Sequence, residues 1–291
     1  MAAEISPRVC WVVTDGRAGI EAQALGLAEA IARRAPVEII LKRLRVRAPY
    51  RSLPREVWRD PFAHLEGDSD PVAPPWPDLW IGCGRLSVPF SIAARKRAPN
   101  AFVVQLQNPR APLGAFDLVI PPEHDGVRGE NVFPILGSPN RIDPTTLQNS
   151  IVPGLAPVAV LVGGENKVFR FDEQDAATLA EKLVALQTPL DVTVSRRTPR
   201  AASELLRSIL GDFASRFFDP VRSETPNPYP AMLATARAIL VTEDSVNMAA
   251  EAASTGKPVY ILPLRRKPFA HARKFDAFHE GLRARNAARL F

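Results

Sequence analysis

The feature that most constrains this chain is a repeated alternation of short β-branched apolar segments with segments of helical periodicity. Arg8–Thr14 is a β-branched run, and apolar residues at helical spacing follow it over about Glu21–Arg34. The alternation continues to the C-terminus, with one interruption near the middle. Because alternating strands and helices form parallel sheets that are covered on both faces, the pattern predicts an α/β fold.

The interruption lies at Ser138–Pro157, which contains prolines, Asn and Thr without periodicity, as domain linkers do. A chain of 291 residues is long enough for two domains. We therefore predict two Rossmann-like, doubly wound domains, residues 1–145 and 146–291, that face each other across a cleft. Ligands of open parallel sheets bind outside the carboxyl ends of the strands, so functional residues are expected in the loops that follow strands.

The predicted elements divide between the two halves. The first half has strands at Arg8–Thr14, Val37–Leu41, Leu79–Cys83, Ala101–Leu106, Asp117–Ile120 and Val132–Leu136, and helices at Glu21–Arg34 and Val88–Arg97. The second half has strands at Val158–Val162, Leu190–Ser195, Arg216–Phe218, Ala238–Thr242 and Pro258–Leu262, and helices at Asp172–Gln187, Ala201–Leu210, Pro230–Thr235 and Val246–Ser254. Asp172 is a predicted N-cap. Tyr50–Pro77, rich in proline and charge, is expected to be irregular structure over the surface.

Composition narrows the class of protein. Hydrophobic residues make up 46% and charged residues 23%, which is the balance of a soluble globular protein and excludes a disordered or collagen-like chain. Cys10 and Cys83 lie in separate apolar runs, which predicts two buried free thiols and argues against zinc and dithiol chemistry. No secretory signal and no apolar run of about 20 residues occur. We expect a cytoplasmic protein, with peripheral contact at the inner membrane surface as an option.

The net charge of +6 favours anionic partners. No nucleic-acid-binding motif accompanies the charge, so nucleic acid is not expected as a partner. One basic stretch surrounds Pro268 and Phe269, and its members are Arg265, Arg266, Lys267, His271, Arg273 and Lys274. This stretch could face anionic lipid or an acidic acceptor, and a solvated helix face fits it equally well.

Several well-known catalytic motifs are missing. The chain has no GxxxxGK[ST], no GxGxxG after the first strand, no GxSxG and no HExxH. None of the three tyrosines has a lysine four residues on, which argues against short-chain epimerase chemistry. Asp68–Asp70 imitates the metal-binding DxD of some sugar transferases, but it lies in a proline-rich, non-strand stretch. We therefore predict no metal and no cofactor.

Two loops of the first half carry candidate catalytic groups. In Thr14–Gly19, Asp15 could take a proton from a substrate hydroxyl and Arg17 could hold a phosphate or carboxylate. The alternative is a turn with a solvated Asp–Arg pair. His124, which follows a strand and is flanked by carboxylates, is a second candidate base, against the alternative of a lone surface histidine.

Two loops of the second half carry candidate phosphate ligands. Gly163, Gly164 and Lys167 follow the first strand there. Ser195, Arg196 and Arg197 follow the next strand and precede a helix, so charge, hydrogen-bond donors and helix dipole coincide. An exposed basic turn is the alternative.

The most informative stretch is Ala238–Pro263. A strand ends there, a polar loop caps a short helix, and the residues that could meet a diphosphate are Thr242, Glu243, Asp244, Ser245 and Asn247. Glu251 lies up to two turns into this helix, where a carboxylate could bind two ribose hydroxyls. A carboxylate on an otherwise small, apolar face needs such a partner or solvent.

The segment TEDSxNMxxEAxxxGKP resembles the nucleotide-sugar half of GT-B glycosyltransferases. In those enzymes the Glu of EAxxxGKP holds the ribose of the donor, and the resemblance gives Glu251 this role. The motifs TDGRAGIEAQALGLAEA, QLQNPR, PPEHD, GGENK and SRRTP together resemble the mitochondrial-fission "elongated mitochondria" (ELM) family over nearly the whole chain. Its plant founder acts in organelle division, and bacterial members were once labelled nucleoside-diphosphate-sugar epimerases.

The resulting hypothesis is a metal-independent GT-B glycosyltransferase that uses a UDP-, GDP- or CMP-linked sugar donor and an unknown acceptor. Asp15 or His124 would deprotonate the acceptor, and cationic groups would stabilise the departing diphosphate. One GT-B enzyme that the segment resembles is the UDP-N-acetylglucosamine transferase of peptidoglycan synthesis. This chain lacks the Gly-rich, His-containing first loop of that enzyme and has Asp15 instead. The alternative is a non-catalytic scaffold that keeps the fold and recruits a partner.

Overall fold

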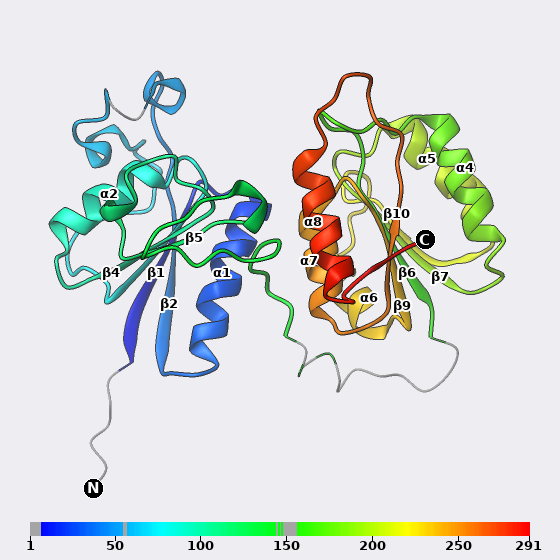
Figure 1. The fold of residues 1–291 in the computed structure, drawn as a ribbon, viewed down its shortest axis with the longest axis horizontal. Helices are drawn as coiled ribbons and strands as arrows, with labels where there is room; N and C mark the ends of the chain where they lie inside the picture. Colours follow the sequence, from blue (N-terminus) through cyan, green and yellow to red (C-terminus); the bar gives the residue numbers. More distant parts are fainter. Residues whose placement is uncertain (1–6, 55–56, 144, 146, 148–155) are drawn as a thin grey trace, which may run out of the picture. The chain divides into compact units, whose positions relative to one another are not determined.

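The computed structural model describes residues 7–54, 57–143, 145, 147 and 156–291. It divides the chain into two units, Met1–Arg141 and Ile142–Phe291, each of which is built on its own parallel sheet (Figure 1). Residues 144, 146 and 148–155 of the expected linker Ser138–Pro157 lie outside the described part.

The first unit has a five-stranded sheet in the order β2-β1-β3-β4-β5, with all pairs parallel. Its strands are β1 (Arg8–Thr14), β2 (Val37–Arg43), β3 (Leu79–Cys83), β4 (Phe102–Leu106) and β5 (Leu118–Ile120). Its helices are α1 (Ala18–Ala32) and α2 (Val88–Arg97), with the 3₁₀ turns η1 (Tyr50–Ser52), η3 (Pro61–His64), η4 (Leu113–Ala115) and η5 (Glu123–Asp125).

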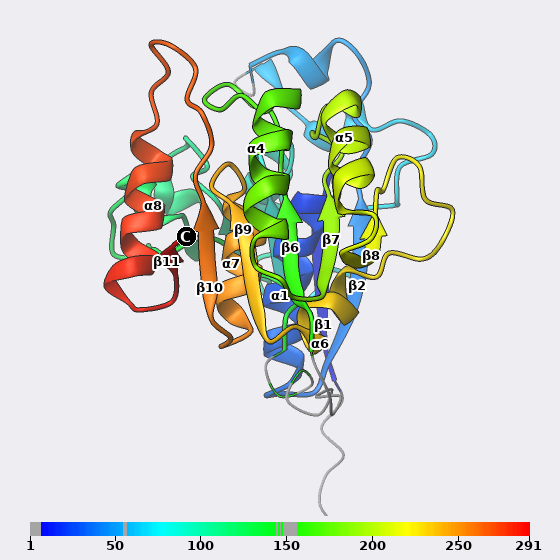
Figure 2. The same ribbon diagram turned by 90° about the vertical axis from the view of Figure 1, so that its right-hand side faces the viewer.

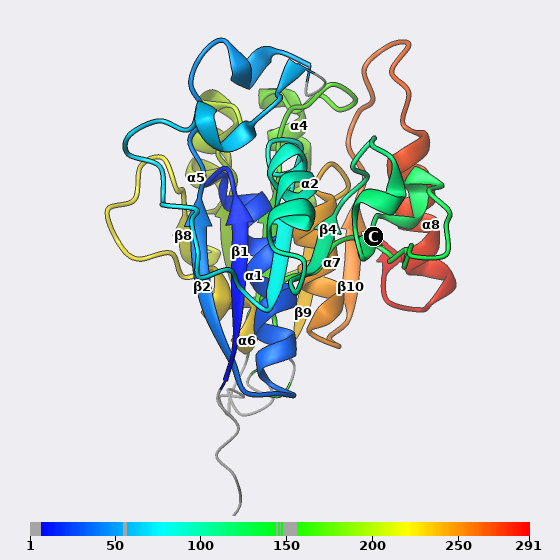
Figure 3. The same cartoon turned by 90° about the vertical axis from the view of Figure 1, so that its left-hand side faces the viewer.

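Strand β1 shows why both faces of this sheet must be covered. Cys10 and Val12 are buried in a cluster with Ala24 and Ala28 of α1. Trp11 and Val13 point to the other face, where the buried cluster includes Phe90 of α2 (Figure 3). Successive side chains of a strand alternate between faces, so an unbroken apolar strand needs a helix on each side.

The expectation that Tyr50–Pro77 is irregular structure over the surface is wrong in one respect, because its aromatic residues complete the core. Trp58 is buried, and its ring lies edge-on to Phe90 of α2 at 6.1 Å between centroids. Phe62 meets the same ring at 5.5 Å. The high content of proline and charge correctly predicted that this segment has no long helix or strand. It did not predict burial, because aromatic side chains can bury a large area even when short 3₁₀ turns carry them.

The predicted strand Val132–Leu136 does not form as a strand. Val132 and Ile135 make only isolated parallel bridges, to Val119 and Pro122, beside β5. Pro134 falls between the two bridges and has no N–H to donate, which prevents a continuous ladder.

The second unit has a six-stranded parallel sheet in the order β11-β10-β9-β6-β7-β8. Its strands are β6 (Val158–Val162), β7 (Leu190–Val194), β8 (Ala214–Phe218), β9 (Ala238–Thr242), β10 (Val259–Leu262) and β11 (Arg289–Leu290). Its helices are α4 (Glu173–Val184), α5 (Arg200–Leu210), α6 (Tyr229–Thr235), α7 (Val246–Ser254) and α8 (Arg273–Ala284).

Helices α4 and α5 pack side by side on one face of this sheet, and α6 and α7 lie on the other (Figure 2). The predicted N-cap at Asp172 is confirmed: its carboxylate accepts from the Asp175 amide at 3.1 Å, and Asp175 returns the bond in a capping box. The C-terminal helix α8 and the short strand β11 were not predicted. The basic residues around Phe269 obscured the periodicity, and α8 buries only Phe278 and Leu282.

The strand order determines which loops lie at the position where α/β sheets bind ligands. In the first sheet β2 lies on one side of β1 and β3 on the other, so the topology reverses between β1 and β3. In the second sheet it reverses between β6 and β9. At such a point the loops after the two strands diverge to opposite faces and leave a crevice, which is where α/β sheets bind ligands.

A buried polar network stabilises the loop after β3. Trp80 Nε1 donates to Ser91 Oγ at 3.0 Å, and Ser91 Oγ donates to Gln105 Oε1 at 2.9 Å. Gln105 Nε2 then donates to Ser87 Oγ, which donates to the carbonyl of Gly84. A chain of satisfied bonds therefore joins two strands, α2 and the loop that leads into it.

We expect Ser91→Ala to lower the free energy of unfolding by about 1–3 kcal/mol, because Trp80 Nε1 loses its acceptor inside the core. Urea denaturation followed by far-UV circular dichroism measures the change. Ser52→Ala, at an exposed serine of the same unit, is the matched control and should change the unfolding free energy by less than about 0.5 kcal/mol. Equal effects of the two substitutions would contradict the assigned role of the network.

Candidate functional site

Three loops meet at the carboxyl ends of β6, β7 and β9. The amide of Gly163, just after β6, donates to Thr242 Oγ1 at 2.7 Å. The amide of Gly164 donates to Asp244 Oδ2 at 3.0 Å. The two glycines therefore bond to the last residue of β9 and to the loop after it, across the point where the strand order reverses.

Asp244 is the centre of this arrangement. Its side chain is 0% exposed and forms an ion pair with Arg197 at 2.8 Å, while the Arg197 side chain remains 42% exposed. Thr242 Oγ1 donates to the other carboxylate oxygen at 2.6 Å. Burial raises the pKa of Asp244, and the Thr242 and Arg197 bonds oppose the rise. Predicted as a ligand, Asp244 instead positions Arg197, because both of its oxygens already accept bonds.

The two glycines are required by close approach. A Cβ at Gly163 would lie 2.2 Å from Asp244 Oδ1, and a Cβ at Gly164 would lie 2.2 Å from the carbonyl oxygen of Arg197. Neither obstacle is the free end of a flexible side chain. The GG pair, predicted to approach an anion, therefore lets the three loops pack against one another.

The hydroxyl groups of the loop after β7 also hold the loops together. Ser195 Oγ donates to the carbonyl of Gly163 at 2.8 Å, and Thr198 Oγ1 donates to the same oxygen. Ser195 Oγ in turn accepts from the amide of Arg197 at 3.1 Å. Arg196, Arg197 and Lys167 are left exposed as the cationic groups of the loops.

Helix α7 begins directly after Asp244. Ser245 is its N-cap, with Oγ accepting from the Met248 amide at 3.4 Å, and Asn247 lies half-buried in the first turn. Glu243 is engaged elsewhere, since its Oε1 accepts from the Leu264 amide at 2.8 Å, and burial raises its pKa. The side chains of Glu243, Asp244 and Ser245 thus all make bonds within the fold, and the amides at the start of α7 follow them directly.

Glu251 is half-buried and its carboxylate accepts a hydrogen bond from the Tyr229 hydroxyl of α6. Burial raises the pKa of Glu251, and the Tyr229 bond opposes the rise. Burial and the neighbouring Glu251 also raise the pKa of Tyr229, so the tyrosine stays a donor. Sequence reasoning missed Tyr229, because it precedes Glu251 by 22 residues and belongs to a different helix.

Lys257 of the GKP segment supports the same region. Its Nζ donates to the carbonyls of Leu233 and Ala234 at the end of α6, the helix that carries Tyr229. A cation at a helix C-terminus satisfies carbonyls that lack intrahelical partners and matches the helix dipole. This lysine therefore has a structural role.

In the first unit, Asp15 and Arg17 pair with each other at 2.7 Å. Asp15 is nearly buried and Arg17 is exposed, and the Asp15 bond raises the pKa of Arg17. The predicted alternative of an Asp–Arg pair therefore describes the contact, although only the arginine is solvated. Nearby, burial raises the pKa of the Cys83 thiol to about 12, so it is inert as a nucleophile.

His124 lies in η5, which follows the edge strand β5. Three strand spacings separate β5 from β1, which corresponds to about 14 Å at the usual distance between neighbouring strands. Asp15 and His124, predicted as alternative bases, therefore follow strands at different places in the sheet, Asp15 beside the reversal of strand order and His124 at the edge.

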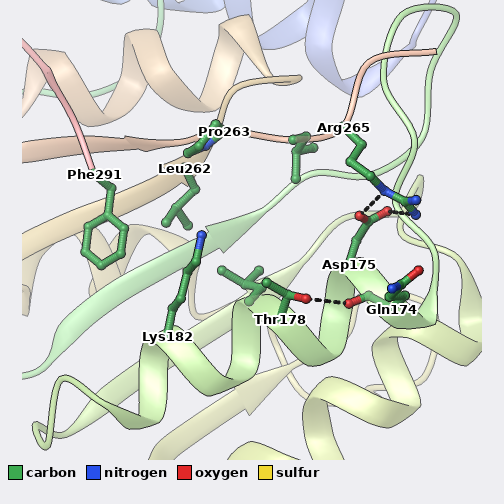
Figure 4. A pocket seen from close by; sticks show the side chains of 10 residues that line it. Gln174, Asp175, Thr178, Lys182, Leu262, Pro263, Arg265 and Phe291 are labelled. Carbon is green, nitrogen blue, oxygen red and sulfur yellow. Dashed lines mark hydrogen bonds and ion pairs between the residues drawn. The ribbon is translucent and has the colours of Figure 1, made fainter. Parts of the chain in front are cut away.

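The basic stretch near the C-terminus is largely paired. Arg265 bonds to Asp172 and Asp175, as Figure 4 shows for Asp175, and Arg266 pairs with Asp276. Phe269, between them and His271, is fully exposed. Beside Arg265 lies a cavity of about 320 Å³ between α4 and the end of β10, with Lys182, Leu262 and Phe291 around it (Figure 4). It contains none of the predicted site residues.

Within the described residues, no group of three or more His, Cys, Asp or Glu side chains is arranged to hold a metal ion. None of the helices in that part of the chain is both long enough and apolar enough to cross a bilayer.

A family model for mitochondrial fission ELM1 matches residues 18–291. The chain belongs to the mitochondrial fission ELM1 family. The resemblance inferred from the five sequence motifs is thereby confirmed.

Two relatives bear this out. RP120, a protein of Rickettsia prowazekii (strain Madrid E), is 28% identical over 97% of this chain and 90% of its own length. The mitochondrial fission protein ELM1 of Arabidopsis thaliana is 28% identical over 74% of this chain. The chain spans 57% of the Arabidopsis protein.

Solved structures confirm the fold. Phytolacca americana UGT2, solved with UDP-2-fluoro-glucose and pterostilbene, matches with a TM-score of 0.52 at 10% identity, over 98% of this chain and 85% of the other. The spinosyn forosaminyltransferase SpnP matches with a TM-score of 0.51 at 15% identity, over 99% and 86%. A candidate UDP-N-acetylglucosamine 2-epimerase of Listeria monocytogenes gives 0.50 at 12% identity, over 94% and 82%. The predicted α/β fold of two Rossmann-like domains, of GT-B type, is confirmed.

The raised pKa of Glu251 has a consequence for stability. The unfolded carboxyl loses its proton near its ordinary pKa of 4.5, while the folded one keeps it to higher pH. The folded state then binds more protons, so the free energy of unfolding falls as pH rises through the interval between the two values. We expect Glu251→Gln to remove this contribution and to give a shallower decline than the wild type above about pH 4.5.

Urea denaturation at a series of pH values from about 4 to 8 measures both curves. Glu181→Gln, at an exposed glutamate of α4, is the control and should follow the wild-type curve. Parallel curves for the wild type and Glu251→Gln would contradict the assignment.

Proposed function

We propose that this protein is a GT-B glycosyltransferase that binds a nucleoside-diphosphate sugar through residues of 146–291 and an acceptor through residues of 1–145. The carrying observation is that Arg197, fixed by the buried Asp244, lies with the start of α7 at the carboxyl ends of β6, β7 and β9. The fold relative UGT2 supports the choice of ligand, since it was solved with UDP-2-fluoro-glucose.

The diphosphate is assigned to the backbone at the start of α7 and to the cationic side chains around it. Arg197 is held in one orientation before any ligand arrives, which lowers the entropic cost of binding. Arg196 and Lys167 add exposed positive charge from neighbouring loops. Together they would stabilise the departing diphosphate without a metal ion.

The ribose is assigned to Glu251. Tyr229 bonds to Glu251 Oε2, and within the described residues no donor reaches Oε1. The tyrosine therefore orients the carboxylate and leaves an oxygen to accept from a ribose hydroxyl. On this proposal Tyr229 is a positioning residue.

Asp15 is proposed as the base that removes the acceptor proton, with Arg17 holding its carboxylate. It is preferred to His124 because it follows β1, beside the point where the strand order of its sheet reverses. Contact of Arg265–Lys274 with anionic membranes has weaker support, since Arg265 and Arg266 are already paired with carboxylates.

Isothermal titration calorimetry with UDP, GDP and CMP tests the donor site. We expect one of these nucleotides to bind, and Glu251→Ala and Arg196→Ala each to weaken its binding by about tenfold, the loss of a charge-assisted hydrogen bond. Arg196 is exposed, so its substitution tests the charge without disturbing the buried Asp244 pair. Glu181→Ala, on the exposed side of α4, should bind as the wild type does.

If none of the three nucleotides binds, or if both variants bind like the wild type, the donor site is wrong. The non-catalytic scaffold then becomes the better hypothesis. Under it, substitutions at Asp15 and Glu251 would leave the cellular phenotype unchanged, and substitutions at exposed residues would alter it.

A further inference from the structure

A cavity of about 640 Å³ lies at the carboxyl ends of β2, β1 and β3 in the first unit. Asp15 follows β1, Arg45 follows β2 and Arg85 follows β3, and all three line it. The cavity thus occupies the point where the strand order reverses, and its size is in the usual range for small-molecule sites.

Four guanidinium groups line this arginine cavity, against two carboxylates. The arginines are Arg17, Arg45, Arg51 and Arg85, and the acids are Asp15 and Glu66. Arg17 is neutralised by Asp15, and Arg45 pairs with Asp68. Among the described residues, Arg51 and Arg85 form no ion pair with an acid. With Glu66 counted against Arg51 and Arg85, the cavity keeps a net positive charge for an anion.

Arg85 is bonded to the end of the turn that carries Arg51. Arg85 Nη2 donates to the carbonyl of Leu53 at 3.4 Å, directly after the η1 turn that carries Arg51. The start of the Arg85 loop is itself held by the bond from Ser87 Oγ to Gly84 at 2.9 Å, part of the buried network under α2. Gly84 has φ of +83°, a conformation that other residues adopt at a cost.

A second cavity of about 230 Å³ adjoins the first, and Arg85 and Leu86 line both. Its other walls include Leu53, Pro89 and Trp58. Trp58 is 7% exposed, and its Nε1 is buried without an acceptor among the described residues. Buried indole N–H groups are normally satisfied, so this orphan donor indicates a place for a ligand atom beside an apolar wall.

We propose that the first unit binds an organic phosphate monoester whose phosphate lies between Arg51 and Arg85 and whose apolar substituent lies over Leu86 against Trp58. Planar guanidinium groups match the oxygens of a phosphate in paired hydrogen bonds. If the proposed function holds, this ligand is the sugar acceptor, and that identification rests on the proposed function. The binding itself does not, and it is tested without a nucleotide.

Phenyl phosphate, inorganic phosphate and benzoate are the probes, titrated into the full chain by isothermal titration calorimetry. We expect phenyl phosphate to bind most tightly, because it occupies both cavities. Arg51→Gln and Arg85→Gln should each weaken it by about tenfold. Leu86→Ala should remove the preference for phenyl phosphate over inorganic phosphate, while leaving inorganic phosphate binding unchanged.

Arg34→Gln is the matched control, since it removes one exposed arginine from the segment after α1 and should leave phenyl phosphate affinity unchanged. The three arginine variants should retain the wild-type circular dichroism spectrum, because Arg34, Arg51 and Arg85 are exposed. Arg51→Gln and Arg85→Gln should also keep any wild-type affinity for UDP, GDP or CMP, so loss of the nucleotide site and loss of this site are distinguishable.

Absence of phenyl phosphate binding, or binding that Arg51→Gln and Arg85→Gln leave unchanged, would overturn the proposal. Benzoate binding as tightly as phenyl phosphate would overturn the assignment to phosphates. Loss of phenyl phosphate binding in Arg196→Ala, with retention in Arg51→Gln, would place the anion in the second unit instead.

Discussion

The candidate donor site depends on one buried carboxylate. Asp244 accepts from the Gly164 amide and the Thr242 hydroxyl and pairs with Arg197, so a single side chain joins the loops after β6, β7 and β9. Breaking a buried pair by removing one partner is costly, because the remaining charge stays buried. Arg197 forms an ion pair with the buried Asp244, and its own side chain remains exposed to solvent, where an anion can reach it. On the proposed function, this one interaction has both a structural and a binding role.

The two units share one arrangement of sheet and loops, and they differ in how the loops contact one another. Each has a parallel sheet whose strand order reverses once, and each places polar loops at that reversal. In the second unit the loops bond tightly to one another, and glycines at 163 and 164 allow the approach. In the first unit the loops surround a cavity that carries an excess of arginine. Exposed arginine side chains therefore lie at the carboxyl edges of both sheets, and they contribute to the net charge of +6.

Much of the fold was predictable because its signals are local. The strands and helices from β6 to β10 lie close to the predicted segments, since apolar runs and capping residues such as Asp172 act within a few positions of the chain. Helix α8 was missed because its short buried face is set among charges. Val132–Leu136 was mistaken for a strand because its apolar residues outweighed Pro134, which lacks the N–H that a continuous ladder needs. The aromatic residues of Tyr50–Pro77 belong to the core through contacts with α2, which no local pattern records.

By itself the sequence determined the α/β class, the two-domain GT-B fold and the family, because periodicity and short motifs are properties of neighbouring residues. It also indicated which loops carry polar chemistry. Only the tertiary structure decided what each of those residues does. Thr242 donates a hydrogen bond to Asp244, and Glu243 accepts one from the Leu264 amide. Tyr229, on another helix, donates to Glu251. The physical reason is that a hydrogen bond or ion pair depends on distance in space, and folding brings together groups that lie tens of residues apart.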